Sequence, residues 1–177
     1  ELETILSTNR DRFQRVCVVT DGIFSMRGDH APLAELDACC EQHQGDYPEG
    51  IVTIVDDSHG IGAFGATGRG TEEVTGTRAD VLIGTLGKAF GVNGGYVVAS
   101  TATIAYLRET APLYIYSNPV TPAEAAAALA ALDVLESPEG LRLLEQLRHF
   151  SRKLRTGLQQ LGFETLDGEH PIVPIFI

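Results

Sequence analysis

Residues 79–96, ADVLIGTLGKAFGVNGGY, contain the element around which the rest of this chain is organised. The short apolar run at residues 81–83 is typical of a strand that is covered on both faces of a parallel sheet. Thr85 and the glycines that follow end the run. The pattern therefore predicts that Lys88 lies just past the end of a buried strand.

Lysine is rare in this chain. Lys88 and Lys153 are the only two, and arginine supplies nearly all the positive charge. A lysine amine loses its proton when it is desolvated and then attacks a carbonyl, which a guanidinium cannot do. The alternative is a loop lysine whose stem lies on apolar surface while its head reaches water. Lys88 is thus a candidate nucleophile whose neighbours must decide its role.

Length and charge limit the classes of protein that this chain can represent. Its 177 residues suffice for one domain, or for one domain and part of another, and would bury roughly 70% of the unfolded surface. The net charge of -11 argues against a general nucleic-acid binder and against a binder of anionic membranes, because both need a basic face. The longest apolar tract, residues 125–135, is alanine-rich and contains Asp133, which argues against a membrane span or a signal peptide.

The three cysteines fit neither a disulfide framework nor a metal site, because Cys39 and Cys40 are adjacent and Cys17 lies in an apolar run. We expect buried thiols in a reducing compartment, and hence a cytoplasmic protein. Residue 1 is not Met, and the sequence stops inside the apolar run PIVPIFI. This favours an internal segment of a longer protein.

Strand patterns and helix patterns alternate along the first part of the chain. Strands are predicted at residues 16–20 (VCVVT, of the buried type), 51–55, 81–83 and 94–99, with helices at 1–15 (weak), 33–43 and 102–108. Two helices then follow at residues 123–136 and 137–161, and strands at 163–166 and 172–177. The predicted fold is α/β, a mainly parallel sheet flanked by helices. Residues 1–136 would form part of a large domain, and residues 137–177 the start of a smaller α+β domain.

The second long helix carries a predicted apolar stripe and a predicted basic face. The stripe consists of leucines at positions 141, 144, 147, 154, 158 and 161. The basic residues Arg148, Arg152, Lys153 and Arg155 are interpreted as a solvated face rather than an anion site.

Polar side chains follow three of the predicted strands. Ser25 comes after the first strand, Asp56 and His59 after the second, and Thr85 with Lys88 after the third. The carboxyl ends of parallel strands share one edge of a sheet, so these groups are expected to converge in one crevice. A buried Asp56 needs a cationic partner or a cluster of donors, and a protonated pyridine nitrogen is such a partner. Taken singly, Asp56 could be a loop cap and His59 a satisfied histidine, whereas together with Lys88 they indicate imine chemistry.

Several longer segments resemble the α-oxoamine synthase family of pyridoxal-phosphate (PLP) enzymes, which have the aspartate aminotransferase fold type. These segments are TDGIFSMRGD (20–29), IVDDSHGIGAFGATGRG (54–70), GTLGKAFG (84–91), GGYVVAS (94–100) and YSNPVTP (116–122). Within the family, the wording DDSH, YSNP and GEHPIVPI is most similar to the glycine C-acetyltransferase branch, also called 2-amino-3-ketobutyrate CoA ligase. The 8-amino-7-oxononanoate synthase branch shares FSM, the GRG loop and GTLGKA. The segments GDYPEG and GVNGGY depart from both branches.

The resemblance implies roles for the residues at the strand ends. Lys88 would form the covalent imine with PLP and would also move the α-proton of the substrate. Asp56 would pair with the ring nitrogen of PLP, which keeps the ring an electron sink. His59 and Ser25 would lie near the phenolic oxygen of the cofactor.

The resemblance also implies a cofactor phosphate site and a partner subunit. Thr85 would hold the phosphate with its hydroxyl group, while Ser117 and Asn118 would reach the phosphate of the neighbouring subunit's cofactor in a homodimer with shared active sites. The implied reaction condenses an amino acid, glycine by preference, with an acyl-CoA, acetyl-CoA by preference, or cleaves 2-amino-3-oxobutyrate in reverse. The alternatives are an 8-amino-7-oxononanoate synthase-like enzyme of biotin synthesis, an aminotransferase, and a catalytically silent subunit. Further family residues would lie upstream and downstream of this segment, which is therefore expected to be incomplete by itself.

Overall fold

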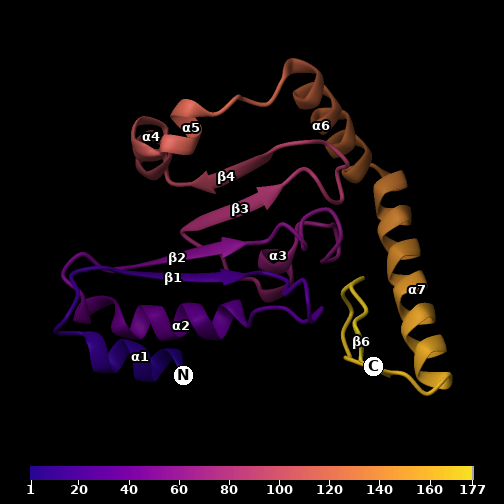
Figure 1. Ribbon diagram of the computed structural model, residues 1–177, viewed down its shortest axis with the longest axis horizontal. Coiled ribbons are helices and arrows are strands. Elements are labelled where there is room, and N and C mark those ends of the chain that lie inside the picture. The colour runs from indigo at the N-terminus through magenta and orange to yellow at the C-terminus, as the bar shows by residue number, and fades with distance from the viewer. Residues whose placement is uncertain (177) are drawn as a thin grey trace.

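The computed structural model describes residues 1–176, which form a four-stranded sheet flanked by helices, a long helix and a small two-stranded sheet (Figure 1). The elements are α1 (Leu2–Asn9), β1 (Val16–Asp21), α2 (Leu33–His43), the 3-10 helix η1 (Gln44–Asp46), β2 (Ile51–Asp56), α3 (Thr71–Thr75), β3 (Val81–Thr85), β4 (Gly95–Ala99), α4 (Thr101–Thr110), α5 (Pro112–Tyr116), α6 (Pro122–Leu135), α7 (Pro138–Gln160), β5 (Glu164–Thr165) and β6 (Ile175–Phe176). The strand predicted for residues 172–177 shortens to β6, and its last predicted residue lies outside the described part of the chain.

The large sheet has the order β1-β2-β3-β4. Strands β1, β2 and β3 are parallel, and β4 runs antiparallel to β3. The register sets Asp21 opposite Asp56, and Asp56 opposite Ile83, so three strands end at the same edge. The prediction of a mainly parallel sheet flanked by helices is confirmed.

The core lies where α1 and α2 pack on the sheet. One buried cluster joins Leu6, Cys40, Tyr47 and Ile51, and the Tyr47 hydroxyl donates to the Leu6 carbonyl at 2.7 Å. A second cluster joins Ala31, Leu33 and Val55. Fully burying a side chain of the size of leucine stabilises a fold by about 1.5–3 kcal/mol. These clusters therefore hold α1 and α2 against one face of the sheet.

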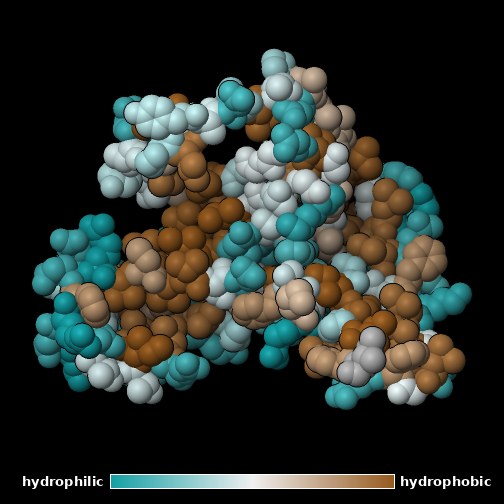
Figure 2. Space-filling view, viewed as in Figure 1, coloured by the Kyte–Doolittle hydropathy of each residue, from teal (hydrophilic) through white to brown (hydrophobic). Residues whose placement is uncertain are grey.

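Strand β1 is not buried on both faces, which corrects the prediction made for VCVVT. Val16 and Val18 pack toward the helical core, whereas Cys17 is exposed and Val19 is 67% exposed on the opposite face. The reason is that α1 and α2 cover one face of this edge strand and no described element covers the other. Figure 2 shows hydrophobic side chains gathered over the strands on that side of the molecule. The prediction that Cys17 is a buried thiol is therefore wrong, while Cys40 is buried as predicted.

Helix α7 corrects both predictions made for its faces. Arg155 is only 7% exposed, and Arg148 donates to the carbonyls of Gly65 and Ala66 at 2.6 and 3.0 Å, so only Arg152 and Lys153 belong to an exposed basic face. The apolar stripe is also only partly packed. Leu144 is buried, but the leucines at positions 141, 154 and 161 are exposed.

Two further features of the helices bear on the predictions. Helix α6 begins with a capping box, in which the Thr121 hydroxyl accepts from the Glu124 amide at 3.3 Å and the Glu124 carboxylate accepts from the Thr121 amide at 2.8 Å. Helix α7 follows after Glu136 and Ser137, at the predicted domain boundary between residues 136 and 137. This boundary stays a prediction. Across residues 1–176, no helix combines the length and the apolar character that a bilayer crossing requires.

Candidate active site

The loops that follow β1 and β2 continue the parallel pairing of the sheet for one more residue. The Gly22 amide donates to the Asp56 carbonyl at 2.8 Å, and the Asp57 amide donates to the Ile83 carbonyl at 2.9 Å. These bonds hold the start of each loop at the strand spacing. The polar residues after the three strands therefore begin from one shared edge, as the sequence predicts.

Asp56 stands at the end of β2 with its side chain partly buried. Its Oδ1 accepts from the Ser58 amide at 3.0 Å, which is the loop-cap role considered as an alternative. Within residues 1–176, no donor reaches the other carboxylate oxygen, Oδ2. One carboxylate oxygen thus shapes the turn, and the second is free to accept from a cationic N–H group.

Asp57 has a different environment, although it is the next residue. Its side chain is fully buried, and it accepts from the amide and the hydroxyl of Thr71 at 2.6 and 2.7 Å. Burial raises the pKa of Asp57, and the two Thr71 bonds act in the opposite direction. A methyl group at Gly22, Gly60 or Gly70 would overlap the Asp57 carboxylate, so these three positions have room only for glycine. Asp57 is a structural anchor for the loops around it.

The pKa of the His59 imidazole depends on its burial and on the charged groups at this edge of the sheet. Burial lowers its pKa most, the charge of Lys88 lowers it further, and the charges of Asp21 and Asp56 raise it. Lys88, Asp21 and Asp56 all stand at or just past strands that end at this edge of the sheet. The structure brings Asp56, His59 and Lys88 to one end of the sheet. Asp21 is a member that sequence reasoning missed, although its place directly after the apolar run of β1 is the same signal that identified Asp56.

Thr85 shapes the loop that presents Lys88. Its hydroxyl donates to the Gly94 carbonyl at 3.2 Å and accepts from the Gly87 amide at 3.1 Å. The Gly91 amide closes the turn on the Lys88 carbonyl at 3.1 Å, and the lysine side chain is exposed. Thr85 is thus placed at the base of the Lys88 loop, with bonds to its backbone.

The other predicted site residues, Ser25, Ser117 and Asn118, are exposed in two further loops. Ser25 is exposed in a loop that is pinched by a bridge between Ile23 and His30. Ser117 and Asn118 are exposed just after α5. Because β4 runs back along β3, α4 and α5 lie at the opposite end of β3 from the Lys88 loop (Figure 1). After Asn118 the chain passes beside the Lys88 loop, where Val120 lies next to Gly94 and the Glu124 carboxylate accepts from the Asn93 side chain at 2.9 Å.

His170 is a residue whose contact with the site the sequence did not indicate. Its Nε2 lies 3.0 Å from the His59 carbonyl oxygen, although 111 positions separate the two residues. A contact of this range leaves no local pattern in the sequence, because neither periodicity nor motif spacing extends over such a distance.

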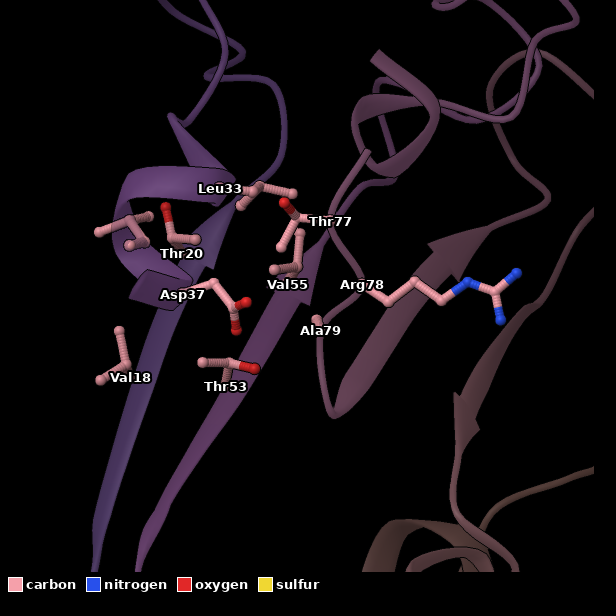
Figure 3. A pocket seen from close by; sticks show the side chains of 10 residues that line it. Val18, Thr20, Leu33, Asp37, Thr53, Val55, Thr77, Arg78 and Ala79 are labelled. Atoms are coloured by element: carbon pink, nitrogen blue, oxygen red, sulfur yellow. The ribbon is translucent and has the colours of Figure 1, made fainter. Parts of the chain in front are cut away.

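A small cavity on the α2 side of the sheet is separate from this edge (Figure 3). Its lining includes Val18 and Thr20 of β1, Thr53 and Val55 of β2, Leu33 and Asp37 of α2, and Ala79. The Arg78 side chain points away from it. The cavity therefore lies between the layers and does not include the strand-end residues.

The donor set at the strand ends suits an organic cofactor better than a metal. No group of three or more His, Cys, Asp or Glu side chains in residues 1–176 has metal-binding geometry. The set instead combines an amine, a carboxylate with a free oxygen and an imidazole whose neutral form is favoured. An amine forms an imine with an aldehyde, and a carboxylate stabilises a protonated ring nitrogen.

Known proteins resemble this chain over nearly its whole length. The family profile for class I and II aminotransferases matches residues 1–176. An 8-amino-7-oxononanoate synthase of Geobacter metallireducens is 46% identical over 165 residues, which are 92% of this chain and 41% of that protein. One from Geotalea daltonii is 42% identical over 178 residues, 99% of this chain and 44% of that protein. The chain thus spans less than half the length of these relatives.

Solved structures agree with the sequence comparison. A serine palmitoyltransferase from S. paucimobilis, with a bound PLP-myriocin aldimine, matches with a TM-score of 0.84 and 28% identity over 99% of this chain and 45% of that one. An 8-amino-7-oxononanoate synthase from Francisella tularensis matches with a TM-score of 0.75 and 27% identity over 97% of this chain and 50% of that one. These relatives support the resemblance to α-oxoamine synthases. They do not support the glycine C-acetyltransferase branch, and they favour the branch given as the alternative.

Proposed function

The chain belongs to the class I and II aminotransferase family, and from that premise we propose that it is the lysine-bearing part of a PLP-dependent enzyme that joins an amino acid to an acyl thioester. The observation that supports this proposal most is the gathering of Lys88, Asp56 and His59 at one end of the parallel strands. A silent subunit would not need such a lysine.

The residues fit the cofactor group by group. The Lys88 Nζ, exposed on a loop held by Thr85, is available to bind the aldehyde carbon of PLP covalently. The free Oδ2 of Asp56 would hold a proton on the ring nitrogen. When bound, PLP supplies an electron-withdrawing ring that stabilises negative charge on the α-carbon of the amino acid. The hydroxyl of Thr85 would exchange its bond to the Gly94 carbonyl for one to the cofactor phosphate.

The remaining residues would move a proton and orient the substrate. Once Lys88 Nζ is no longer bound to the cofactor, it would take the proton from the α-carbon of the amino acid. It would later return a proton to the same carbon. His59 and Ser25 would orient groups near the phenolic oxygen, and the lowered pKa of His59 keeps its imidazole neutral near pH 7. Ser117 and Asn118 are exposed just after α5, so both would be accessible to the cofactor of a partner subunit in a homodimer.

The name of the relatives' product defines the substrates that we propose. In 8-amino-7-oxononanoate, carbons 1–7 form a seven-carbon acyl group that ends in a carboxylate, and carbon 8 bears the amine with carbon 9 as its methyl group. The acyl donor would therefore be a pimeloyl thioester, and the amino acid would be alanine. The new bond joins carbons 7 and 8, the thioester C–S bond breaks to release a thiol, and the alanine carboxylate leaves as carbon dioxide.

Condensation of glycine with acetyl-CoA is the second candidate, and one observation favours it. The segments DDSH, YSNP and GEHPIVPI are similar to the glycine C-acetyltransferase branch. The two candidates share the roles of Lys88, Asp56 and His59. They differ in the acyl chain and in the side chain of the amino acid.

Thiol release by the full-length protein loaded with PLP separates these candidates. Alanine and glycine would each be tested with pimeloyl-CoA and with acetyl-CoA. We expect amino-acid-dependent thiol release to be fastest with alanine and pimeloyl-CoA. Fastest release with glycine and acetyl-CoA would support the second candidate. Amino-group transfer to a keto acid without thiol release would contradict both.

A further inference from the structure

His170 is buried next to the candidate site, and both of its ring nitrogens have partners. The side chain is 3% exposed. Nδ1 accepts from the Ile172 amide at 3.1 Å, so Nε2 carries the proton and donates to the His59 carbonyl at 3.0 Å. Burial lowers the pKa of His170, which favours the neutral ring with this one tautomer. In the hydrogen bond between the two residues, His170 is therefore the donor and the His59 carbonyl the acceptor.

The backbone around His170 is itself held by helix α7. Arg155 is 7% exposed, and its Nε donates to the Leu166 carbonyl at 3.0 Å. Its Nη2 donates to the His170 carbonyl at 3.2 Å. A buried guanidinium that binds two carbonyls holds this segment in place, since the carbonyl of the buried His170 would otherwise lack a donor.

The same segment touches the loop that carries Ser25. Gly28 has φ +76°, and a methyl group there would lie 2.6 Å from the Ile172 carbonyl oxygen. The Phe64 ring lies between those of His30 and His170, with centroids 5.5 and 5.6 Å away. The segment around His170 thus packs against the loop that carries Ser25 and the loop that carries His59.

We propose that His170 is a positioning residue that fixes the carbonyl of His59 and thereby the direction of the His59 ring at the active site, an inference that rests on the proposed function. The Gly60 amide belongs to the same peptide group as the His59 carbonyl, and it donates to the Asp57 carbonyl at 2.9 Å, so this peptide is held on both sides. Without the His170 donor, the partly buried His59 carbonyl would lose its partner, and any rotation of the peptide toward water would also break the Gly60 bond to Asp57. The turn at residues 57–60 would then shift as a unit, and the His59 Cα would move its imidazole with it.

The pKa of His59 in the full-length apo-protein tests this inference without relying on the cofactor. Histidine-selective ¹³C labelling and NMR would follow the titration, with the His59 signal assigned from a His59→Asn variant. In His170→Ala we expect the pKa of His59 to rise by about 0.5 or more, because burial is the largest cause of its lowered value. Lys88, Asp21 and Asp56, the charged groups that act on His59, are unchanged in this variant.

Two matched substitutions separate the hydrogen bond from packing. His170→Gln keeps a donor in the same place and should restore the pKa of His59, whereas His170→Met fills the space without a donor and should raise it. His149→Ala, which removes an exposed histidine of α7, should change nothing. If His170→Ala does not fold, the comparison of His170→Gln with His170→Met still decides the matter.

Kinetics of the PLP-loaded enzyme give the second readout. We expect His170→Met to lower kcat about tenfold with little change in KM for the acyl thioester, and His170→Gln to recover most of the loss. A fall in the unfolding temperature of His170→Met with an unchanged pKa of His59 would overturn the proposal. Thiol release that does not depend on an amino acid, together with the expected shift of the pKa, would refute the proposed function alone.

Discussion

Replacement of Asp57 by alanine tests whether two adjacent carboxylates have separate tasks, one in the fold and one in the chemistry. The Asp57 carboxylate accepts two short bonds from Thr71, and both residues are fully buried. A hydrogen bond to a charged group contributes about 1.5–3 kcal/mol, so losing both bonds should cost about 3–6 kcal/mol. This is a large part of the roughly 5–15 kcal/mol that stabilises a typical domain.

Urea unfolding of the full-length apo-protein, followed by circular dichroism, measures this cost. Asp57→Asn is the first control, and it should lose less because an amide can still accept from the Thr71 amide. Asp56→Asn is the second control. It should lose less than about 1 kcal/mol, since the amide oxygen of Asn can still accept from the Ser58 amide, yet it should abolish turnover. The reasoning is refuted if Asp57→Ala loses less than about 1 kcal/mol or if Asp56→Asn is equally destabilised.

Three other predictions concern helix α1, the partner subunit and the cofactor phosphate. His43 lies 2.7 Å from Asp46 and 2.9 Å from Glu3, and these carboxylates raise its pKa above the ordinary 6.5, Asp46 most strongly. The stabilisation from the protonated ring should be complete below pH 6.5 and disappear as pH rises through the raised pKa, so amide exchange in α1 should accelerate there and lose this step in His43→Gln. Leu113 is 83% exposed in α5, and Leu113→Asp should yield monomers in sedimentation velocity if α5 lies at the homodimer interface. Thr85→Val should weaken PLP binding about tenfold in a fluorescence titration, because it removes both the proposed phosphate donor and the bonds of this hydroxyl to Gly87 and Gly94 in the Lys88 loop.

Local patterns suffice to predict the sheet and the strand-end residues. The apolar runs before Asp56 and Thr85 indicate strands, and the rule that parallel strands end at one edge places Asp56, His59 and Lys88 together on the basis of the sequence alone. The same rule also applies to Asp21. The helix that begins at Pro122 is predictable as well, because its cap depends on residues three positions apart.

Features that depend on distant segments cannot be predicted in this way. Arg155 has the spacing of a solvated basic face and is therefore predicted to be exposed. Helical periodicity does not reveal that two carbonyls from a later segment lie beside it. His170 gives no signal for the same reason. VCVVT has the composition of a strand buried on both faces, but exposure of its outer face depends on which elements cover β1. Short motifs such as DDSH favour the glycine C-acetyltransferase branch, whereas identity over nearly the whole chain favours the 8-amino-7-oxononanoate synthase branch. A motif of a few residues carries less information than the full length.

The absorbance of the full-length protein with PLP tests the central claim most directly, because an imine between Lys88 and the cofactor absorbs at roughly 420 nm. The chain offers its own matched control, since Lys153 is the one other lysine in this sequence and lies exposed on α7. Borohydride reduction followed by peptide mapping would locate the modified lysine. We expect the band, and the reduced adduct on Lys88, in the wild type and in Lys153→Ala, and neither in Lys88→Ala. A band that persists in Lys88→Ala, or an adduct on another residue, would contradict the account.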